Sequence, residues 1–239
     1  MPSDVHEIAP DIFRIASSIP GRPVTFIQFL IRDERPLLYH TGSRALFPET
    51  LAAVRRVLDP TSLRYISWSH LESDECGAIN DFLAVARDAE PVQGQLGLQS
   101  GGDFVARPIK VMTDNGVLDL GAKRLRLLVT PHVPHSWDAI MAYEETTGTL
   151  LCSDLFASAG KPAPLSESDV VGPAVARIRQ EPDAFPIGPH TAVVLDRLAA
   201  LQPKVIAGHH SSAYADDAVQ ALRDLKREMF RVAGLDEAL

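Results

Sequence analysis

The segment His70-Leu-Glu72-Ser-Asp74 constrains the fold of this chain more than any other part of the sequence. Its three side chains are of types that bind metals, and they follow an apolar run, Arg64 to Trp68, with the composition of a buried strand. Alternate residues of an extended chain share one face, so these side chains point toward one place. The segment predicts a metal site at the edge of a β-sheet.

Three more segments end in residues of the same kind. Strand-like runs at residues 125–130, 150–153 and 204–207 are followed by His135, by Asp154 and by the pair His209-His210. Carboxylates supply hard oxygen ligands and imidazoles supply borderline nitrogen ligands. We therefore expect one metal centre at which all four segments meet.

Composition excludes several classes of protein. A chain of 239 residues with 46% hydrophobic residues can bury a sizeable core, and because no linker divides it we expect a single domain over residues 1–239. The net charge is −8 and the Lys and Arg residues are scattered, which is not the pattern of a nucleic-acid binder. Nucleic acid is not an expected partner.

The sequence also gives an expectation about location. No window approaches about 20 uninterrupted apolar residues, and the N-terminus lacks the cationic and apolar regions of a secretory signal, so we expect no membrane association. Two cysteines, Cys76 and Cys152, do not make the disulfide framework of a secreted domain. A cytoplasmic protein is expected.

The hydrophobic pattern predicts an α/β fold. Strands are expected at residues 12–16, 24–31, 37–39, 64–68, 109–112, 117–120, 123–129, 139–143, 149–152 and 204–207, and helices from Pro48 to about Leu58, at 77–87, at 191–201 and after residue 217. Asp114-Asn-Gly116 predicts a hairpin turn, and residues 157–189 are expected to be a long irregular excursion over the site. Two β-rich halves that each end in helices predict an αβ/βα sandwich of two central sheets with helices outside.

These motifs resemble those of the metallo-β-lactamase superfamily, and within it the diiron branch of flavodiiron proteins and stand-alone oxygen-binding diiron relatives. The likeness rests on His70-x-Glu72-x-Asp74, on the 19-residue step from His135 to Asp154, and on Ile-Ala-Gly-His-His at residues 206–210. Hydrolases of the superfamily typically carry a second histidine where Glu72 stands, whereas the diiron branch carries a carboxylate. Glu72 therefore favours the diiron branch.

The resemblance implies a ligand set. His70, Glu72 and His135 are implied to hold one metal, Asp74 and a C-terminal histidine the other, and Asp154 to bridge them. His210 matches the diiron pattern and His209 matches the Gly-His run of the hydrolases; we expect His210, with only one of the two facing the site. His132 is a second candidate for the ligand position assigned to His135. The eight-residue step from His135 to Tyr143 favours His135 as the ligand, and His132 is then expected to support the ligands without binding the metal.

Two residues depart from the family pattern. Glu75 stands where the family commonly has histidine, and it either coordinates the second metal or turns outward and leaves that metal weakly bound. His40 stands where the family generally has an aspartate that orients ligands through hydrogen bonds. The sequence decides neither case.

The function implied by the resemblance is that of a non-haem diiron protein that binds or reduces dioxygen, or nitric oxide, at two iron ions, with zinc or manganese as other candidate metals. No catalytic residue is expected beyond the metal ligands. Because the sequence ends at Leu239, we expect no flavodoxin module and no FMN in it. We expect instead an external electron donor, either a flavoprotein or a rubredoxin-type protein, or assembly into a homodimer. The alternative is a binuclear metallohydrolase of an ester, lactone or thioester.

Overall fold

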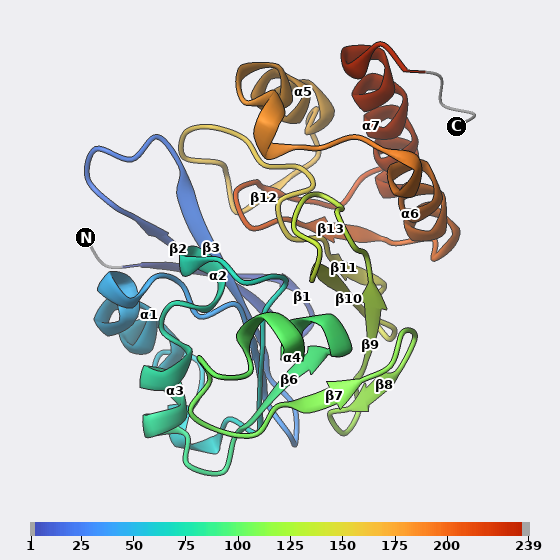
Figure 1. Ribbon diagram of the computed structural model, residues 1–239. Coiled ribbons are helices and arrows are strands. Elements are labelled where there is room, and N and C mark those ends of the chain that lie inside the picture. Colours follow the sequence, from blue (N-terminus) through green and yellow to red (C-terminus); the bar gives the residue numbers. More distant parts are fainter. Residues whose placement is uncertain (1–2, 236–239) are drawn as a thin grey trace.

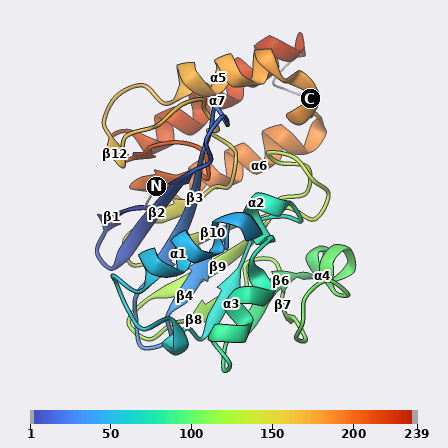
Figure 2. The same ribbon diagram turned by 90° about the vertical axis from the view of Figure 1, so that its left-hand side faces the viewer.

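Two β-sheets pack face to face between two groups of helices in the computed structural model, which describes residues 3–235 (Figures 1 and 2). Helices α5, α6 and α7 gather on one side of the strands, and α1 and α3 on the other. The predicted αβ/βα sandwich is confirmed. None of the helices between residues 3 and 235 combines the length and apolar composition needed to span a bilayer.

The first sheet has seven strands in sequence order. They are β1 (Asp4–Ala9), β2 (Ile12–Ser18), β3 (Thr25–Ile31), β4 (Leu37–Tyr39), β5 (Tyr65–Ser67), β6 (Glu90–Gly94) and β7 (Lys110–Met112). The strands from β1 to β4 run antiparallel and those from β4 to β7 run parallel. The outer helices of this half are α1 (Phe47–Val54), α2 (Ser73–Cys76), α3 (Ile79–Val85) and α4 (Gln95–Gly101).

The second sheet has the order β12-β14-β13-β11-β10-β9-β8. Its strands are β8 (Val117–Asp119), β9 (Arg124–Val129), β10 (Ile140–Glu144), β11 (Thr149–Leu151), β12 (Leu165–Ser166), β13 (Val205–Ala207) and β14 (Ala213–Tyr214). Strands β8 to β11 form an antiparallel meander, and β13 adds to β11 in parallel. Helices α5 (Val171–Gln180), α6 (Pro189–Ala200) and α7 (Ala218–Ala233) cover it.

Alternation of apolar side chains along the strands produces three hydrophobic layers. In β2, Ile12 points between the sheets and Ile15 points toward α1 and α3. In β11, Leu150 packs toward α5–α7 while Leu151 packs between the sheets. Strands that are buried on both faces read as continuous apolar runs, which explains why they are recognisable in the sequence.

Helix α7 shows how local sequence sets these elements. The Asp217 side chain accepts a hydrogen bond from Gln220 N at 2.9 Å and caps the first turn, and Gly234 ends the helix with φ of 66°. Between them Leu222, Leu225 and Met229 recur at helical spacing and pack on the second sheet.

The predicted hairpin at Asp114-Asn-Gly116 is wrong. Strand β7 pairs with β6 in the first sheet, whereas β8 pairs with β9 in the second, so this turn carries the chain from one sheet to the other. Asp114 Oδ1 accepts from Val129 N at 2.8 Å and from Arg197 Nη2 at 2.6 Å. These contacts tie the crossover to β9 and α6, and a sequence window of a few residues does not contain them.

The excursion at residues 157–189 contains more regular structure than expected. It holds β12 and α5, and in α5 the side chains of Ala174, Val175 and Ile178 are buried against the second sheet. Gly172 and Pro173 in its first turn make this helix difficult to recognise from the sequence. The sequence pattern also did not predict strands β1, β6 and β14 or helix α4.

Phe82 tests the layer between the first sheet and its helices. The side chain is 0% exposed and its ring meets that of Phe47 edge-on at 5.0 Å. Phe82→Ala is expected to lower the free energy of unfolding by about 3–5 kcal/mol in chemical denaturation, because it opens a cavity that the sheet cannot fill. Phe104, which is 46% exposed, is the matched control, and Phe104→Ala should change the free energy of unfolding by less than about 0.5 kcal/mol. Equal losses in the two variants would contradict the packing described.

Candidate metal centre

The predicted donors meet at one end of the two sheets. His70 follows β5, Asp154 follows β11, and His209 and His210 follow β13, while His135 lies between β9 and β10. Strands β4, β5, β11 and β13 end at this edge, which is why residues far apart in sequence converge. Three groups have ligand atoms within 4.8 Å of one another: His70, Glu72, His135 and Asp154; Asp74, His209 and His210; and Glu72, Asp74 and Glu75.

The first group centres on two imidazoles. His135 Nε2 lies 2.9 Å from His70 Nε2 and 3.2 Å from Asp154 Oδ2, and Glu72 Oε1 lies 3.7 Å from His70 Nε2. Burial lowers the pKa of His135, but Asp154 and Glu72 outweigh it and raise the pKa above its ordinary value. Two ring nitrogens that face each other at this distance need either a proton shared in a hydrogen bond or a metal ion between them.

The second group contains both adjacent histidines. Asp74 Oδ2 lies 3.4 Å from His210 Nε2 and 3.7 Å from His209 Nε2. Burial raises the pKa of Asp74, but the two imidazoles outweigh it and hold the pKa below its ordinary range. The expectation that only one histidine faces the site is wrong, because residues 209 and 210 lie in a turn after β13 rather than on an extended strand.

The first sheet fixes the orientation of both rings. His210 Nδ1 donates to Thr25 O at 2.8 Å, and His209 Nδ1 donates to Ile27 O at 2.5 Å. A carbonyl only accepts, so each proton lies on Nδ1 and each Nε2 presents its lone pair to the carboxylates. This is the tautomer that a metal-binding histidine needs.

Asp154 lies between the two groups. Its Oδ2 contacts His135 Nε2 at 3.2 Å, and its Oδ1 lies 3.6 Å from His210 Nε2. Burial raises the pKa of this carboxyl, but the surrounding histidines outweigh it and hold the pKa below its ordinary range. One carboxylate thus faces both groups with separate oxygens.

Glu75 turns into the centre. Its carboxylate is 0% exposed, and Oε1 lies 3.7 Å from His70 Nε2 and 3.9 Å from His209 Nε2. Burial raises the pKa of Glu75 well above its ordinary value, and the charges of Asp154 and Asp74 raise it further. Of the two alternatives left open by the sequence, the inward orientation holds.

His40 connects the two groups from behind. Its Nδ1 lies 3.1 Å from His209 Nδ1, and its Nε2 lies 3.0 Å from Ser69 Oγ, which lies 2.9 Å from His70 Nδ1. Ser153 Oγ donates to Ser69 Oγ at 2.9 Å. Burial and the neighbouring His209 lower the pKa of His40 well below its ordinary value, so the ring is neutral. Sequence reasoning missed Ser69 and Ser153, although both immediately precede a predicted donor.

His132 stays outside the centre. Its side chain is exposed and stacks on His190 with ring centroids 6.0 Å apart, and it belongs to none of the three donor groups.

Several donor atoms are buried without a hydrogen-bond donor or acceptor among residues 3–235. They are Glu75 Oε1, Glu75 Oε2, Asp154 Oδ1, His209 Nε2 and His135 Nδ1. Burying polar or charged groups without partners is costly, and a cation that binds to these atoms removes the cost. The first four point to the carboxylate and imidazole donors around them, so the residues present fit a pair of transition-metal ions.

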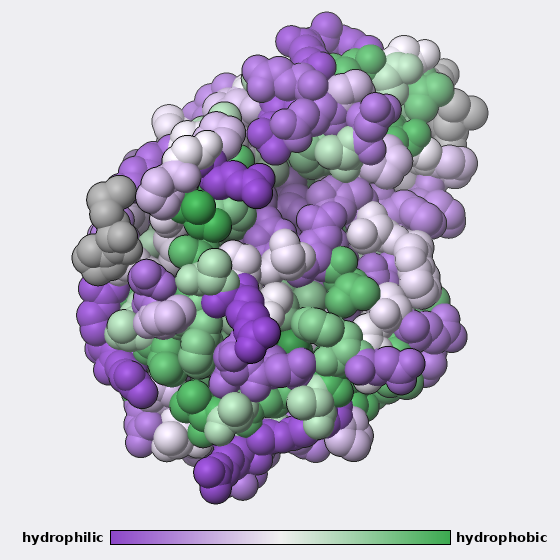
Figure 3. Space-filling view, turned by 60° about the vertical axis from the view of Figure 1, so that its left-hand side comes forward, coloured by the Kyte–Doolittle hydropathy of each residue, from purple (hydrophilic) through white to green (hydrophobic). Residues whose placement is uncertain are grey.

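A cavity of about 420 Å³ opens onto the donors. Phe26 and Phe185 form apolar walls, with ring centroids 5.6 Å from His210 and 5.8 Å from His135 respectively, and Arg22 and Arg177 also line it. None of these four was predicted; the only signal was the expected excursion over the site, which supplies Arg177 and Phe185. Figure 3 shows hydrophilic residues gathered on the upper part of one face, at the level of α5 and α7, above a hollow in the surface.

Left-handed backbone surrounds the donors. His40, His132, Ser136 and Ser153 have φ between 53° and 65°, a conformation that residues other than glycine seldom adopt. Ser136 follows His135, and Ser153 precedes Asp154. The donor loops are therefore held in conformations that the rest of the fold imposes.

Comparisons with known proteins identify the relatives of this chain. Residues 24–210 match the family model described as "ODP family beta lactamase". The putative diflavin flavoprotein A 3 of Nostoc sp. is 30% identical over 138 residues, which cover 55% of this chain and 23% of that protein. The flavo-diiron protein FprA2 of Clostridium acetobutylicum is 26% identical over 215 residues, which cover 84% of this chain and 53% of that protein.

A solved structure shows the same fold. The rubredoxin oxygen:oxidoreductase of Desulfovibrio gigas superimposes with a TM-score of 0.82 at 18% identity, over 96% of this chain and 62% of that one. The chain spans about a quarter of the length of the Nostoc relative and about half of the length of the Clostridium relative.

Proposed function

We propose, on the premise that this chain belongs to the ODP beta-lactamase family and so to the diiron branch of the metallo-β-lactamase superfamily, that it binds dioxygen or nitric oxide at a pair of iron ions. The names of its relatives support this assignment, since one is a flavo-diiron protein and another a rubredoxin oxygen:oxidoreductase. Reduction of the diatomic molecule is the activity we propose when electrons are supplied.

The convergence of donors carries the proposal. Four carboxylates and four imidazoles surround one point, and the buried oxygens of Glu75 and Asp154 lack hydrogen-bond donors among the described residues. Such a set, richer in carboxylate than an all-histidine zinc site, favours iron. The adjoining cavity of about 420 Å³ has room for a small molecule beside the donors.

We assign the donors to two metals. His70, Glu72 and His135 would hold the first; Asp74, His210, His209 and Glu75 would hold the second; and Asp154 would bridge them. Two iron ions held there would supply electrons to a bound diatomic molecule. The eight-donor assignment differs from the sequence-based one by adding His209 and Glu75 to the second metal.

The protein's own residues prepare this site. Thr25 O and Ile27 O hold the protons of His210 and His209 on Nδ1, so their Nε2 atoms remain free to bind. Ser69 and His40 fix the orientation of His70 and His209 from the opposite side. Phe26 and Phe185 wall the cavity with apolar rings, which favours a small uncharged ligand over water.

Electrons must reach the centre from a donor. The relatives' names refer to flavin and rubredoxin, and this chain spans only part of their length. We propose an external flavoprotein or a rubredoxin-type protein as the donor.

Nitric oxide titration tests the function. Protein grown with added iron, reduced with dithionite and titrated anaerobically with nitric oxide should develop a visible absorption band that saturates at about one or two nitric oxide molecules per chain. Glu72→His should shift bound metal from iron toward zinc and weaken the band, because a neutral imidazole replaces a carboxylate at one position.

Zinc-loaded wild-type protein is the control, and it should develop no band. The proposal fails if the reduced iron protein responds to neither nitric oxide nor air while a zinc-loaded form hydrolyses a thioester or lactone. That result would leave the family assignment intact and select the hydrolase.

A further inference from the structure

Arg14 is a buried cation that makes no ion pair with the residues that the structure describes. It lies in β2 on the face shared with Ile12 and Ala16, between the two sheets, and is 1% exposed. Its one side-chain hydrogen bond among residues 3–235 runs from Nη2 to Ser211 O at 3.3 Å, and its buried Nε has no acceptor. No carboxylate of those residues comes within 4.0 Å of it. Burying a charge in this way is costly unless a counter-ion is supplied.

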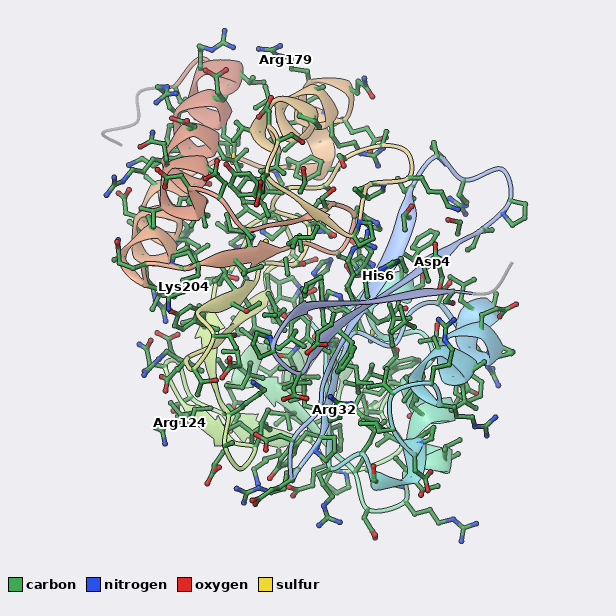
Figure 4. The ribbon with its side chains drawn as sticks, turned by 180° about the vertical axis from the view of Figure 1, so that it is seen from behind. Asp4, His6, Arg32, Arg124, Arg179 and Lys204 are labelled. Carbon is green, nitrogen blue, oxygen red and sulfur yellow. The ribbon has the colours of Figure 1, made fainter. Side chains whose placement is uncertain are left out.

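The guanidinium remains charged. Burial lowers the pKa of Arg14 to about 10, while the more distant Asp4 opposes that shift, so the group is protonated at neutral pH. Asp4 and His6 lie on the neighbouring strand β1, as Figure 4 shows from behind the sheet, and His6 pairs directly with Arg14 in the strand register. Asp4 is exposed and makes no ion pair with the guanidinium within the described chain.

Arg14 lines a cavity of about 240 Å³ that is separate from the metal cavity. The remaining walls come from Asp4, Ala16, Ser18, Thr25 and residues 161–164. Lys161 adds a second positive charge against the single negative charge of Asp4, so the lining is net positive. No residue lines both this cavity and the one at the metal donors.

The outer wall of the cavity is anchored. Thr25 Oγ1 donates to Gly160 O at 2.9 Å, Gly160 N donates to Pro23 O at 2.6 Å, and Ala213 N donates to Pro164 O at 3.2 Å. Residues 160 and 164 are thus bound to strands on both sides, and Pro162 and Pro164 stiffen the segment between them. The cavity is a built feature of the fold.

We infer that this cavity binds a small oxyanion, a phosphate or carboxylate group, against the Arg14 guanidinium. The planar guanidinium matches the paired oxygens of such anions, and its unused N–H groups provide the donors. The Lys161 ammonium at the rim and the Ser18 hydroxyl would complete the contacts. The anion would supply counter-charge beside a guanidinium that makes no ion pair within residues 3–235.

The site is also connected to the metal centre. Thr25, whose side chain borders the anion cavity, accepts the His210 Nδ1 proton through its carbonyl at 2.8 Å. Ser211, whose carbonyl Arg14 holds, directly follows His210. An anion at Arg14 would therefore lie beside Thr25, whose carbonyl orients His210, and beside the guanidinium that donates to Ser211 O.

Calorimetric titration of the full chain tests the inference, with inorganic phosphate and acetate as separate probes. Wild-type protein should bind at least one of them saturably at one site per chain. Arg14→Leu should weaken binding at least about tenfold, because charge-assisted hydrogen bonds are lost, and Lys161→Ala, at an exposed position, should weaken it less. Arg32→Gln is the matched control: Arg32 is exposed, pairs with Asp11 at 2.7 Å and lies elsewhere on the sheet (Figure 4), so its loss should leave binding unchanged.

The same variants separate this site from anion binding at the metals. Anion that binds the metal centre would persist in Arg14→Leu and disappear in Asp154→Asn, whereas anion at Arg14 should show the reverse pattern. If Arg14→Leu proves unstable, the titration of Lys161→Ala still tests the proposed site. An anion affinity that is the same in Lys161→Ala, in Arg32→Gln and in wild-type protein would contradict the assignment. Absence of binding of both probes to wild-type protein would overturn it.

Discussion

Replacement of Asp154 by alanine is expected to remove both metals together, so that metal content falls from about two per chain to nearly none. The reason is geometric: Oδ2 lies 3.2 Å from His135 in one donor group and Oδ1 lies 3.6 Å from His210 in the other. Loss of the carboxylate removes a donor from each group and leaves the remaining imidazoles and carboxylates without their common partner. Elemental analysis of purified protein by mass spectrometry measures the effect.

Two further variants make this result interpretable. His210→Ala should lower only one of the two metals, because that imidazole contacts Asp74 and a single oxygen of Asp154. Asp196→Ala, which removes an exposed aspartate paired with Lys226, should leave the metal content unchanged. Retention of one full metal equivalent in Asp154→Ala, in protein with normal circular dichroism, would show that Asp154 does not join the two groups.

Glu75→Gln is expected to raise the melting temperature of metal-free protein at neutral pH. The carboxylate is fully buried without hydrogen-bond donors in the described chain, and burial together with Asp154 and Asp74 raises its pKa well above the ordinary value. The folded state thus holds the proton more tightly than the unfolded state, so the free energy of unfolding of wild-type protein falls as pH rises above about 4.3. Glutamine carries no such charge, and each kcal/mol recovered raises the melting temperature by about 2–4 °C.

Metal loading should reverse the sign. If Glu75 binds the second metal, Glu75→Gln should melt below wild type once both proteins are loaded, because a ligand is lost. Glu144 is the matched control, since it is equally buried but accepts hydrogen bonds from Thr146 and Thr147 that outweigh burial and lower its pKa. Glu144→Gln should therefore destabilise the metal-free protein at neutral pH, and the stabilising effect of wild-type Glu144 should fade as pH falls through its lowered pKa. An unchanged pH slope in metal-free Glu75→Gln would refute this account of Glu75.

The sequence predicted the features that depend on short stretches of chain. The strand before His70 and the apolar runs before Asp154 and His209 were recognisable because β5, β11 and β13 are buried on both faces. Since such strands end together at one edge, the donors' proximity could be expected as well. The fold class and the family followed from the same residues.

What the sequence could not provide depends on contacts between distant residues. The partner of β7 is β6, through the pairing of Val92 with Lys110, and the local Asn-Gly signal pointed to a different strand. The shared orientation of His209 and His210 depends on carbonyls of β3, 182 and 185 residues away. The inward turn of Glu75 and the walls formed by Phe26 and Phe185 likewise exist only in the assembled structure.

We expect the left-handed residues around the donors to influence which ions the proposed centre prefers. Each non-glycine residue in that conformation costs about 1–3 kcal/mol, which packing of the surrounding fold must offset. We expect loops held in this way to resist contraction around a smaller ion and expansion around a larger one. Ions at the proposed centre would then be discriminated by radius and preferred geometry as well as by donor softness. A glycine at Ser153, whose φ is 53°, would relieve the strain and allow the Asp154 loop to adapt. The gain in stability should then come with poorer discrimination among ions, and the backbone as well as the side chains would set the selectivity of the proposed centre.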